Sequence, residues 1–179
     1  MNSNLYSNIA IFLKKRAIEF VGLLLILLAI LVSISFFSYS PNDPSLVFGI
    51  EVLNTDNYLG IYGSLVSDFL LQSFGIPSFL ILITILSWGI SLTINKKINQ
   101  ILKKIFYVFL YLIFSCVLIY ESFNNSFWLI DNGNSGFVGK ISYDFIRDLI
   151  PWIGNTYSLA IIFLLTIVFF IFASNLSIK

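Results

Sequence analysis

The chain has 179 residues, of which 58% are hydrophobic and only 11% are charged, and its mean hydropathy is +0.94. A soluble domain carries about a quarter charged residues, so this composition excludes an ordinary globular fold and predicts a membrane protein. The net charge of +1 argues against an extended nucleic-acid surface, the single cysteine excludes an internal disulfide, and the lack of histidine removes the commonest metal ligand and general base.

Four apolar segments are long enough to cross a bilayer, which takes about 20 residues of helix. In chain order they span residues 17–39, 77–94, 101–120 and 152–173. A basic segment, residues 1–16, precedes the first one, which is too long for the apolar part of a signal peptide and is expected to stay as an anchor. We expect residues 17–174 to form a single membrane domain, followed by a short tail, residues 175–179.

Basic residues gather at one end of the predicted spans. Three precede the first span, two lie between the second and the third, and two lie at the start of the third: Lys14, Lys15, Arg16, Lys96, Lys97, Lys103 and Lys104. Residues 40–75 contain no lysine or arginine. Because lysine and arginine stay on the cytoplasmic side, we expect both termini and the middle link in the cytoplasm, and the two longer loops outside.

Each longer loop contains a segment with helical amphipathic periodicity, residues 59–74 and residues 136–150. Polar residues such as Ser64, Asp68 and Gln72 recur four apart along one stripe of the first segment, and apolar residues cover its other face. This pattern predicts a helix that lies in the membrane interface with its polar stripe in water. In the second segment, Lys140 and Asp144 are four apart and are expected to pair, whereas Asp144 and Asp148, also four apart, are expected to repel each other.

The two amphipathic segments also carry an internal repeat. Gly60-Ile61-Tyr62-Gly63, followed by Asp68-Phe69, recurs 76 positions later as Gly136-Phe137-Val138-Gly139, followed by Asp144-Phe145. The sequence therefore predicts an all-α membrane protein with four transmembrane helices in two parallel repeats, each repeat having an external interfacial helix. The spaced glycines favour close helix packing, and a flexible junction between loop and helix is the alternative.

No constellation for catalysis is present in the sequence. It has no G-x-x-x-x-G-K-[ST] phosphate loop, no G-x-S-x-G nucleophile motif and no cluster of metal ligands, so we expect no catalytic, cofactor or metal site. The second, third and fourth spans contain no ionisable residue between their ends, and Glu19 at the start of the first is expected to pair with Arg16.

The segment Ser38-Tyr39-Ser40-Pro41-Asn42-Asp43-Pro44-Ser45, where the first span ends, is called here the exit motif. Together with Asn57-Tyr58-Leu59-Gly60-Ile61-Tyr62-Gly63-Ser64 and the second Gly-x-x-Gly unit, it resembles the four-helix membrane domain at the N-terminus of FtsK/SpoIIIE-type DNA translocases. The residues of interest for assembly are Ser38, Tyr39, Pro41, Asp43, Pro44, Gly60, Gly63, Asp68, Gly136, Gly139 and Asp144.

The resemblance implies a non-catalytic anchor and assembly module of a bacterial cell-division and chromosome-segregation translocase, targeted to the septum in the inner membrane. It implies as partners membrane lipid, further copies of the chain (six, from the family's hexameric motor) and other membrane proteins of the division machinery. The family's ATPase and DNA-reading parts have no counterpart in these residues, so direct contact with nucleic acid is not expected. The alternative function is a small multi-pass transporter or channel subunit, and an intramembrane enzyme is the weakest candidate.

Overall fold

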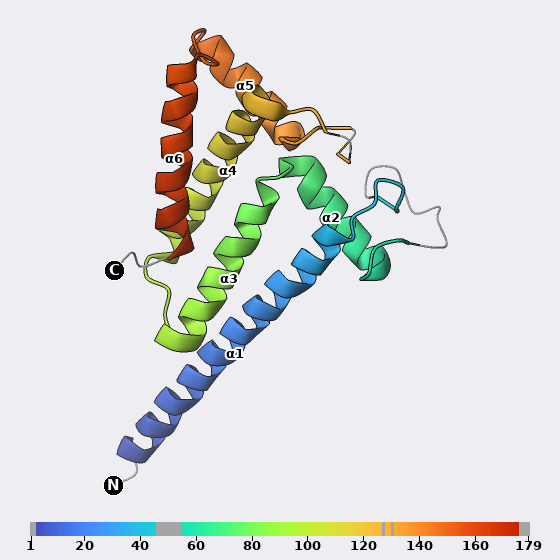
Figure 1. Cartoon of the computed structure of the whole chain (residues 1–179). Coiled ribbons are helices and arrows are strands. Elements are labelled where there is room, and N and C mark those ends of the chain that lie inside the picture. Colours follow the sequence, from blue (N-terminus) through green and yellow to red (C-terminus); the bar gives the residue numbers. More distant parts are fainter. Residues whose placement is uncertain (1–2, 46–54, 127, 130, 176–179) are drawn as a thin grey trace.

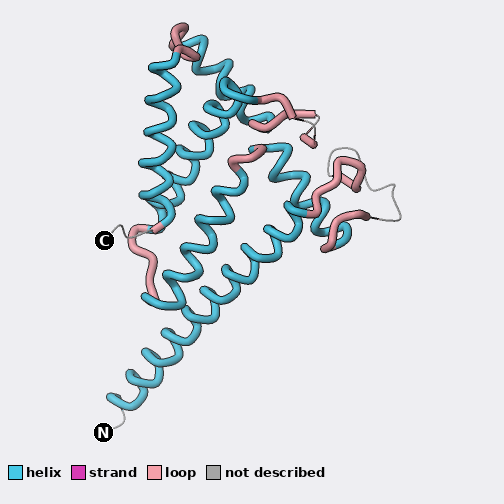
Figure 2. Tube along the Cα trace, viewed as in Figure 1, coloured by secondary structure: helices cyan, strands magenta, loops and turns pink. Residues whose placement is uncertain are grey.

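The computed structural model describes residues 3–45, 55–126, 128–129 and 131–175. The helices in these ranges are α1 (Ser3–Phe37), α2 (Gly60–Phe74), α3 (Ser78–Asn95), α4 (Ile101–Phe123), α5 (Gly136–Leu149) and α6 (Thr156–Ser174). Figure 2 shows that these helices account for most of the described chain. The predicted tail, beyond Asn175, lies outside the described residues.

Four of the helices are long and apolar enough to cross a membrane. These candidate spans are Tyr6–Phe37, Ser78–Asn95, Ile101–Phe123 and Thr156–Ser174. Helices α1 and α4 run in one direction, α3 and α6 run in the other, and the short helices α2 and α5 lie at the same end of the molecule (Figure 1). The prediction of an all-α membrane protein built from two parallel repeats is therefore confirmed.

Helix α1 is longer than the predicted first span. It begins at Ser3 and not at residue 17, and it continues unbroken through the basic cluster. No proline or glycine precedes Gly22, so nothing in this segment interrupts helical hydrogen bonding. Its 35 residues make a rod of about 52 Å, which exceeds the roughly 30 Å hydrocarbon core. The N-terminal part of α1 therefore extends beyond the end of α3 (Figure 1).

Helix α6 begins later than predicted. The apolar pattern predicted a start at Trp152, whereas the helix starts at Thr156 after a turn. Gly154 in that turn has a φ of +97°, and Asn155 is extended. These two backbone conformations are incompatible with a helix, so the apolar residues of this turn lie outside the fourth span.

The two repeats are built as two antiparallel helix pairs. Helix α1 packs mainly on α3, and α4 packs mainly on α6. The pairs meet through α3 with α6, and through α2 with α5. Buried positions in the spans are often small and polar, for example Ser35, Thr84 and Ser115, which is how helices approach closely where the surrounding solvent is lipid.

The crossing of α1 and α3 depends on two glycines. A Cβ atom at Gly22 would lie 2.8 Å from the Gly89 carbonyl oxygen, and one at Gly89 would lie 2.9 Å from the Gly22 carbonyl oxygen. Below this crossing, Glu19 forms an ion pair with Arg16 at 2.5 Å and a second one with Lys96 at the end of α3. The predicted pair between Glu19 and Arg16 is therefore confirmed, and its extension to α3 fixes the relative height of the two helices.

The two repeats are joined where the C-terminal half of α3 meets the end of α6. The Trp88 indole donates to the Ala173 carbonyl at 2.7 Å, and the Ser87 hydroxyl donates to the Ser174 carbonyl. Asn175 donates to the Ser91 hydroxyl at 2.5 Å. The last carbonyls of α6 have no partners within their own helix, so Trp88 and Ser87 satisfy two of them. All three hydrogen bonds hold the end of α6 against α3.

Candidate assembly site: the two junctions beside α2 and α5

The exit motif begins with a tight turn directly after α1. The backbone N–H of Asp43 donates to the carbonyl of Ser40 at 3.2 Å, so Pro41 occupies the second position of a four-residue turn. Proline suits this position because its ring sets φ near the value that the turn requires. Pro41 itself is exposed, so its contribution is to direct the chain.

Asp43 and Pro44 tie this turn to the segment that precedes α2. The Asp43 carboxylate accepts the backbone N–H groups of Asp56 at 2.8 Å and of Asn57 at 3.0 Å. The carbonyl of Pro44 accepts the hydroxyl of Ser64 at 2.6 Å. Hydrogen bonds to a charged acceptor are about twice as strong as those between neutral groups. We therefore expect the two bonds that Asp43 accepts to be the strongest hydrogen bonds of this junction.

Asn57 is buried between α1 and α2 and closes the end of α1. It is 4% exposed, and its side-chain N–H group donates to the carbonyl of Ser35 at 2.9 Å and to that of Ser38 at 3.4 Å. Its side-chain oxygen accepts the N–H of Leu59 at 3.1 Å. The hydroxyl of Ser38 accepts the N–H of Tyr58 at 3.1 Å, so the carbonyls that α1 leaves open are satisfied by residues about 20 positions away.

The two glycines of the first pair have different roles. Gly60 has a φ of +63°, a left-handed conformation in which glycine is favoured, and among the described residues a Cβ there would meet only the Thr55 hydroxyl, at 3.9 Å. Gly63 has no unusual backbone, but a Cβ there would collide with the Asn57 amide and lie 2.6 Å from the Leu59 Cβ. Gly60 therefore starts α2, and Gly63 lets it pack against the preceding loop.

Helix α2 is oriented opposite to the prediction. Its polar stripe is buried, with Ser64 at 1%, Ser67 at 0% and Asp68 at 9% exposure, whereas Tyr62 and Phe69 on the apolar face are 84% and 55% exposed. The expectation that the stripe lies in water is therefore wrong. The reason is tertiary: the polar groups of α2 are hydrogen-bond partners of the exit motif, so its apolar face is the one that stays exposed.

A polar network links the first junction to the second repeat. The hydroxyl of Tyr39 donates to the Asp68 carboxylate at 3.4 Å and accepts the side-chain N–H of Gln72 at 3.0 Å. The side-chain oxygen of Gln72 accepts from Asn132 at 2.8 Å. Burial raises the pKa of Tyr39 to about 12. Burial also raises the pKa of Asp68, with the nearby Asp131 carboxylate adding to the effect.

The raised pKa of Asp68 predicts a pH dependence of stability. Because folding disfavours the charged carboxylate, the free energy of unfolding is expected to rise as pH falls from neutral through the folded-state pKa, and to level off below the ordinary value of 3.8. Asp68→Asn should remove this rise without destabilising the neutral-pH protein. The measurement is thermal unfolding in micelles across pH, with Asp144→Asn as the control that keeps the rise; a rise that survives Asp68→Asn contradicts the assignment.

In the second junction, as in the first, an asparagine side chain donates to carbonyls at the end of the preceding helix. The side-chain N–H group of Asn134 donates to the carbonyls of Phe123 and Asn125, both at 2.9 Å, and so closes the end of α4. Asn124 accepts both the N–H and the hydroxyl of Ser135 through its side-chain oxygen, at 3.0 and 2.7 Å. An asparagine just before the first glycine of each repeat thus caps the helix that precedes it.

Glycines bring the two junctions into direct backbone contact. Gly136 has a φ of +64°, and a Cβ there would lie 2.6 Å from the backbone nitrogen of Phe74. Gly75 has a φ of +63°, and a Cβ there would lie 2.8 Å from the Gly136 nitrogen. The N–H of Ile76 donates to the carbonyl of Asn134 at 2.8 Å. The start of α5 therefore rests on the end of α2 at a place where no side chain fits.

Gly139 and Asp144 complete the predicted set. A Cβ at Gly139 would lie 2.5 Å from the Ser135 hydroxyl and 3.0 Å from the Cys116 carbonyl, so this glycine lets α5 approach α4. Asp144 pairs with Arg147 at 3.7 Å, and its side chain is 45% exposed. The predicted pair of Asp144 with Lys140 is not formed, and Asp144 differs from buried Asp68 although the repeat places them at equivalent positions.

The predicted residues thus fall into two groups. Eight of them meet at the first junction: Ser38, Tyr39, Pro41, Asp43, Pro44, Gly60, Gly63 and Asp68. The other three lie in α5. The list of residues of interest for assembly did not include Asn57, Ser64 or Asn134, although an asparagine close before each Gly-x-x-Gly unit was a signal that could have found two of them.

Four lipid-length helices, with two polar junctions at one end of them, define this chain as a multi-pass membrane domain. Residues 14–179 match the family model of the 4TM region of DNA translocase FtsK/SpoIIIE, and the chain belongs to this family. A DNA translocase FtsK of Rickettsia bellii is 30% identical over 133 residues, which are 74% of this chain and 16% of that protein. The chain therefore spans a small part of that relative's length. No solved structure matches the chain significantly.

Proposed function

We propose that this chain is the membrane-anchoring and assembly module of an FtsK/SpoIIIE-type DNA translocase, with no catalytic activity of its own. The observation that carries the proposal is the family match, which runs through all four spans and both junctions. The proposed place of action is the division septum of the bacterial inner membrane, where the module holds the translocase during cell division and chromosome segregation.

The proposed orientation puts both termini in the cytoplasm. The start of α1, the link between α3 and α4 and the end of α6 lie toward one end of the helices, and α2 and α5 lie at the other (Figure 1). The first of these ends carries most of the basic residues, including Lys14, Lys96 and Lys103, whereas α5 carries Lys140 and Arg147. Positive charge is retained on the cytoplasmic side, so α2, α5 and the exit motif face the outside.

The arrangement of the junctions supports an assembly role. Hydrogen bonds inside the domain engage most polar groups of the exit motif and of α2, whereas aromatic residues at this end stay exposed, among them Tyr58 and Tyr62 at 82% and 84% exposure. Exposed aromatic residues are favoured anchors of protein interfaces. The proposed partners are further copies of this chain and other membrane proteins of the division machinery.

The test is the location of a fluorescent fusion of the chain in dividing bacteria. The expected result is enrichment at midcell. A fusion that carries Ile90→Leu, a conservative change at an exposed position of α3, should show the same enrichment as the parent chain. Uniform membrane fluorescence of a stably inserted fusion contradicts septal targeting. The same fusion, purified in mild detergent, is expected to elute as an oligomer; elution as a monomer contradicts self-association and leaves the targeting result standing.

A further inference from the structure

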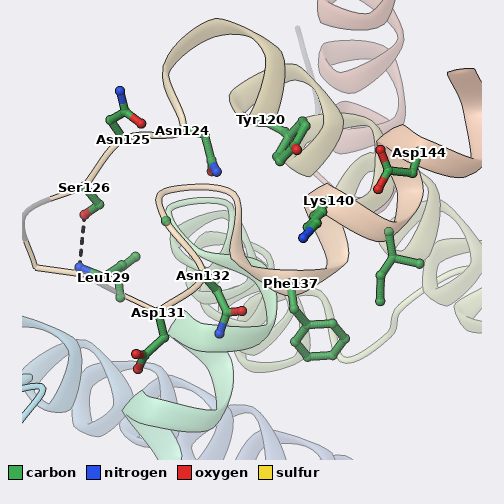
Figure 3. Close-up of a pocket in the computed structure, with 12 residues that line it drawn as sticks. Tyr120, Asn124, Asn125, Ser126, Leu129, Asp131, Asn132, Phe137, Lys140 and Asp144 are labelled. Atoms are coloured by element: carbon green, nitrogen blue, oxygen red, sulfur yellow. Dashed lines mark hydrogen bonds between the residues drawn. The ribbon is translucent and has the colours of Figure 1, made fainter.

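A cavity of about 810 Å³ opens in the second external junction, and none of the roles above uses it. Its walls are the end of α4, the link that follows it and the first turns of α5 (Figure 3). Volumes of about 300–1,000 Å³ are typical of small-molecule sites. The lining mixes amides, charged groups and apolar side chains, so the cavity offers both directional hydrogen bonds and desolvating walls.

Lys140 supplies a cation without a partner in this cavity. Its expected partner, Asp144, is 3.7 Å from Arg147 instead. Within the described part of the chain, the Lys140 ammonium group makes no ion pair or hydrogen bond. In Figure 3 its side chain extends from α5 toward the loop that carries Asn124 and Asn132. An ammonium group in this position suits a carboxylate ligand.

Two asparagines beside Lys140 are held in fixed orientations. The side-chain oxygen of Asn124 is occupied by Ser135, so its N–H group is left as a donor. The side-chain N–H of Asn132 is directed to Gln72 at 2.8 Å, so its oxygen is left as an acceptor. One donor and one acceptor match the carbonyl and the N–H of a peptide unit.

Two carboxylates line the same cavity. Asp131 and Asp144 are both at its walls, so a ligand with several negative charges is repelled and an ammonium group on the ligand is attracted. Phe137 and Ile141 add apolar surface suited to a small side chain. The lining therefore favours a ligand with one carboxylate, an adjacent peptide unit and a positive end.

We propose that this cavity binds a peptide carboxylate, with Lys140 pairing with the carboxylate and with Asn124 and Asn132 bonded to the adjacent peptide unit. The carboxylate comes either from the free end of a short peptide or from an acidic side chain of a partner segment. The inference depends on the cavity alone and stands or falls independently of septal targeting.

The experiment measures binding to the full chain in nanodiscs by titration calorimetry, with both membrane faces accessible. The probes are alanyl-alanine and alanyl-alaninamide, which differ only in the carboxylate. The expected result is binding of the acid and at least about tenfold weaker binding of the amide. Lys140→Gln should lose the same factor for the acid, whereas the control Lys97→Gln, an exposed lysine of the α3–α4 link, should bind as the parent chain does.

Three results would overturn the proposal: equal binding of acid and amide, unchanged binding by Lys140→Gln, or no heat from any carboxylate probe. A further probe, acetyl-alanyl-glutamyl-alaninamide, distinguishes the two sources. Preference for alanyl-alanine assigns the site to a free peptide end, and preference for the blocked peptide assigns it to an acidic segment of a partner. Thermal unfolding of Lys140→Gln should match that of Lys97→Gln, because both side chains are exposed.

Discussion

Replacing Gly89 by leucine is expected to separate α1 from α3 and to lower the thermal stability of the domain more than any other single change considered. A Cβ at this position would lie 2.7 Å from the Ile26 side chain and 2.9 Å from the Gly22 backbone. Overpacking costs about 1–3 kcal/mol where neighbours can shift. Here one neighbour is helix backbone, so the helices themselves must move apart.

The measurement for Gly89→Leu is thermal unfolding in micelles, followed by size-exclusion recovery. Trp88 adjoins the site and donates to the Ala173 carbonyl, so a red shift of tryptophan fluorescence should accompany the loss of packing. The matched control is Ile90→Leu, a change on the exposed side of α3, where the isoleucine is 44% exposed. Equal stability of the two variants would show that α1 and α3 do not cross at these glycines.

Replacing Gly63 by alanine is expected to open the first junction. The added Cβ collides with the Asn57 amide and lies 2.6 Å from the Leu59 Cβ. Relief of the clash displaces Asn57, which then gives up its bonds to the Ser35 and Ser38 carbonyls. A buried donor or acceptor left without a partner costs about 1–3 kcal/mol, so the loss should reach several kcal/mol.

The control for Gly63→Ala is Gly60→Asn, three residues earlier. Gly60 needs a left-handed backbone and not space, and asparagine adopts that conformation more readily than other residues with a side chain. We expect Gly60→Asn to keep most of the stability and Gly63→Ala to lose it in the same thermal assay. The opposite order would mean that the first junction is held by backbone conformation and not by packing.

The sequence alone predicted the membrane character, the four spans and the repeat. These depend on local properties, since the length of an apolar run and the spacing of glycines are visible in the chain itself. The short helices were predicted close to their observed bounds of Gly60–Phe74 and Gly136–Leu149 because helical periodicity is also local. The start of α1 differs most from the predicted bounds, because the apolar run marks the membrane span whereas the helix already begins at Ser3, before the basic cluster.

The orientation of α2 was decided only by the tertiary structure. An amphipathic pattern states that one face differs from the other, and it does not state which face meets the protein. Ser64 and Ser67 lie inward because their partners outside α2, the Pro44 carbonyl and the Asn57 side chain, belong to the junction that the exit motif closes. For the same reason, Asp68 and Asp144 share a place in the repeat but differ in burial.

The contacts that hold the domain together were likewise invisible in the sequence. Gly22 and Gly89 are 67 positions apart, and no pattern in the sequence around either glycine indicates that they are in contact. Asn57 and Asn134 find their partners in helices that end well before them. The sequence by itself determined that this chain lies in a membrane and how many times it can cross, since both follow from the hydrophobicity of contiguous segments. Only the tertiary structure decided which polar groups are buried, because burial depends on partners that folding brings together.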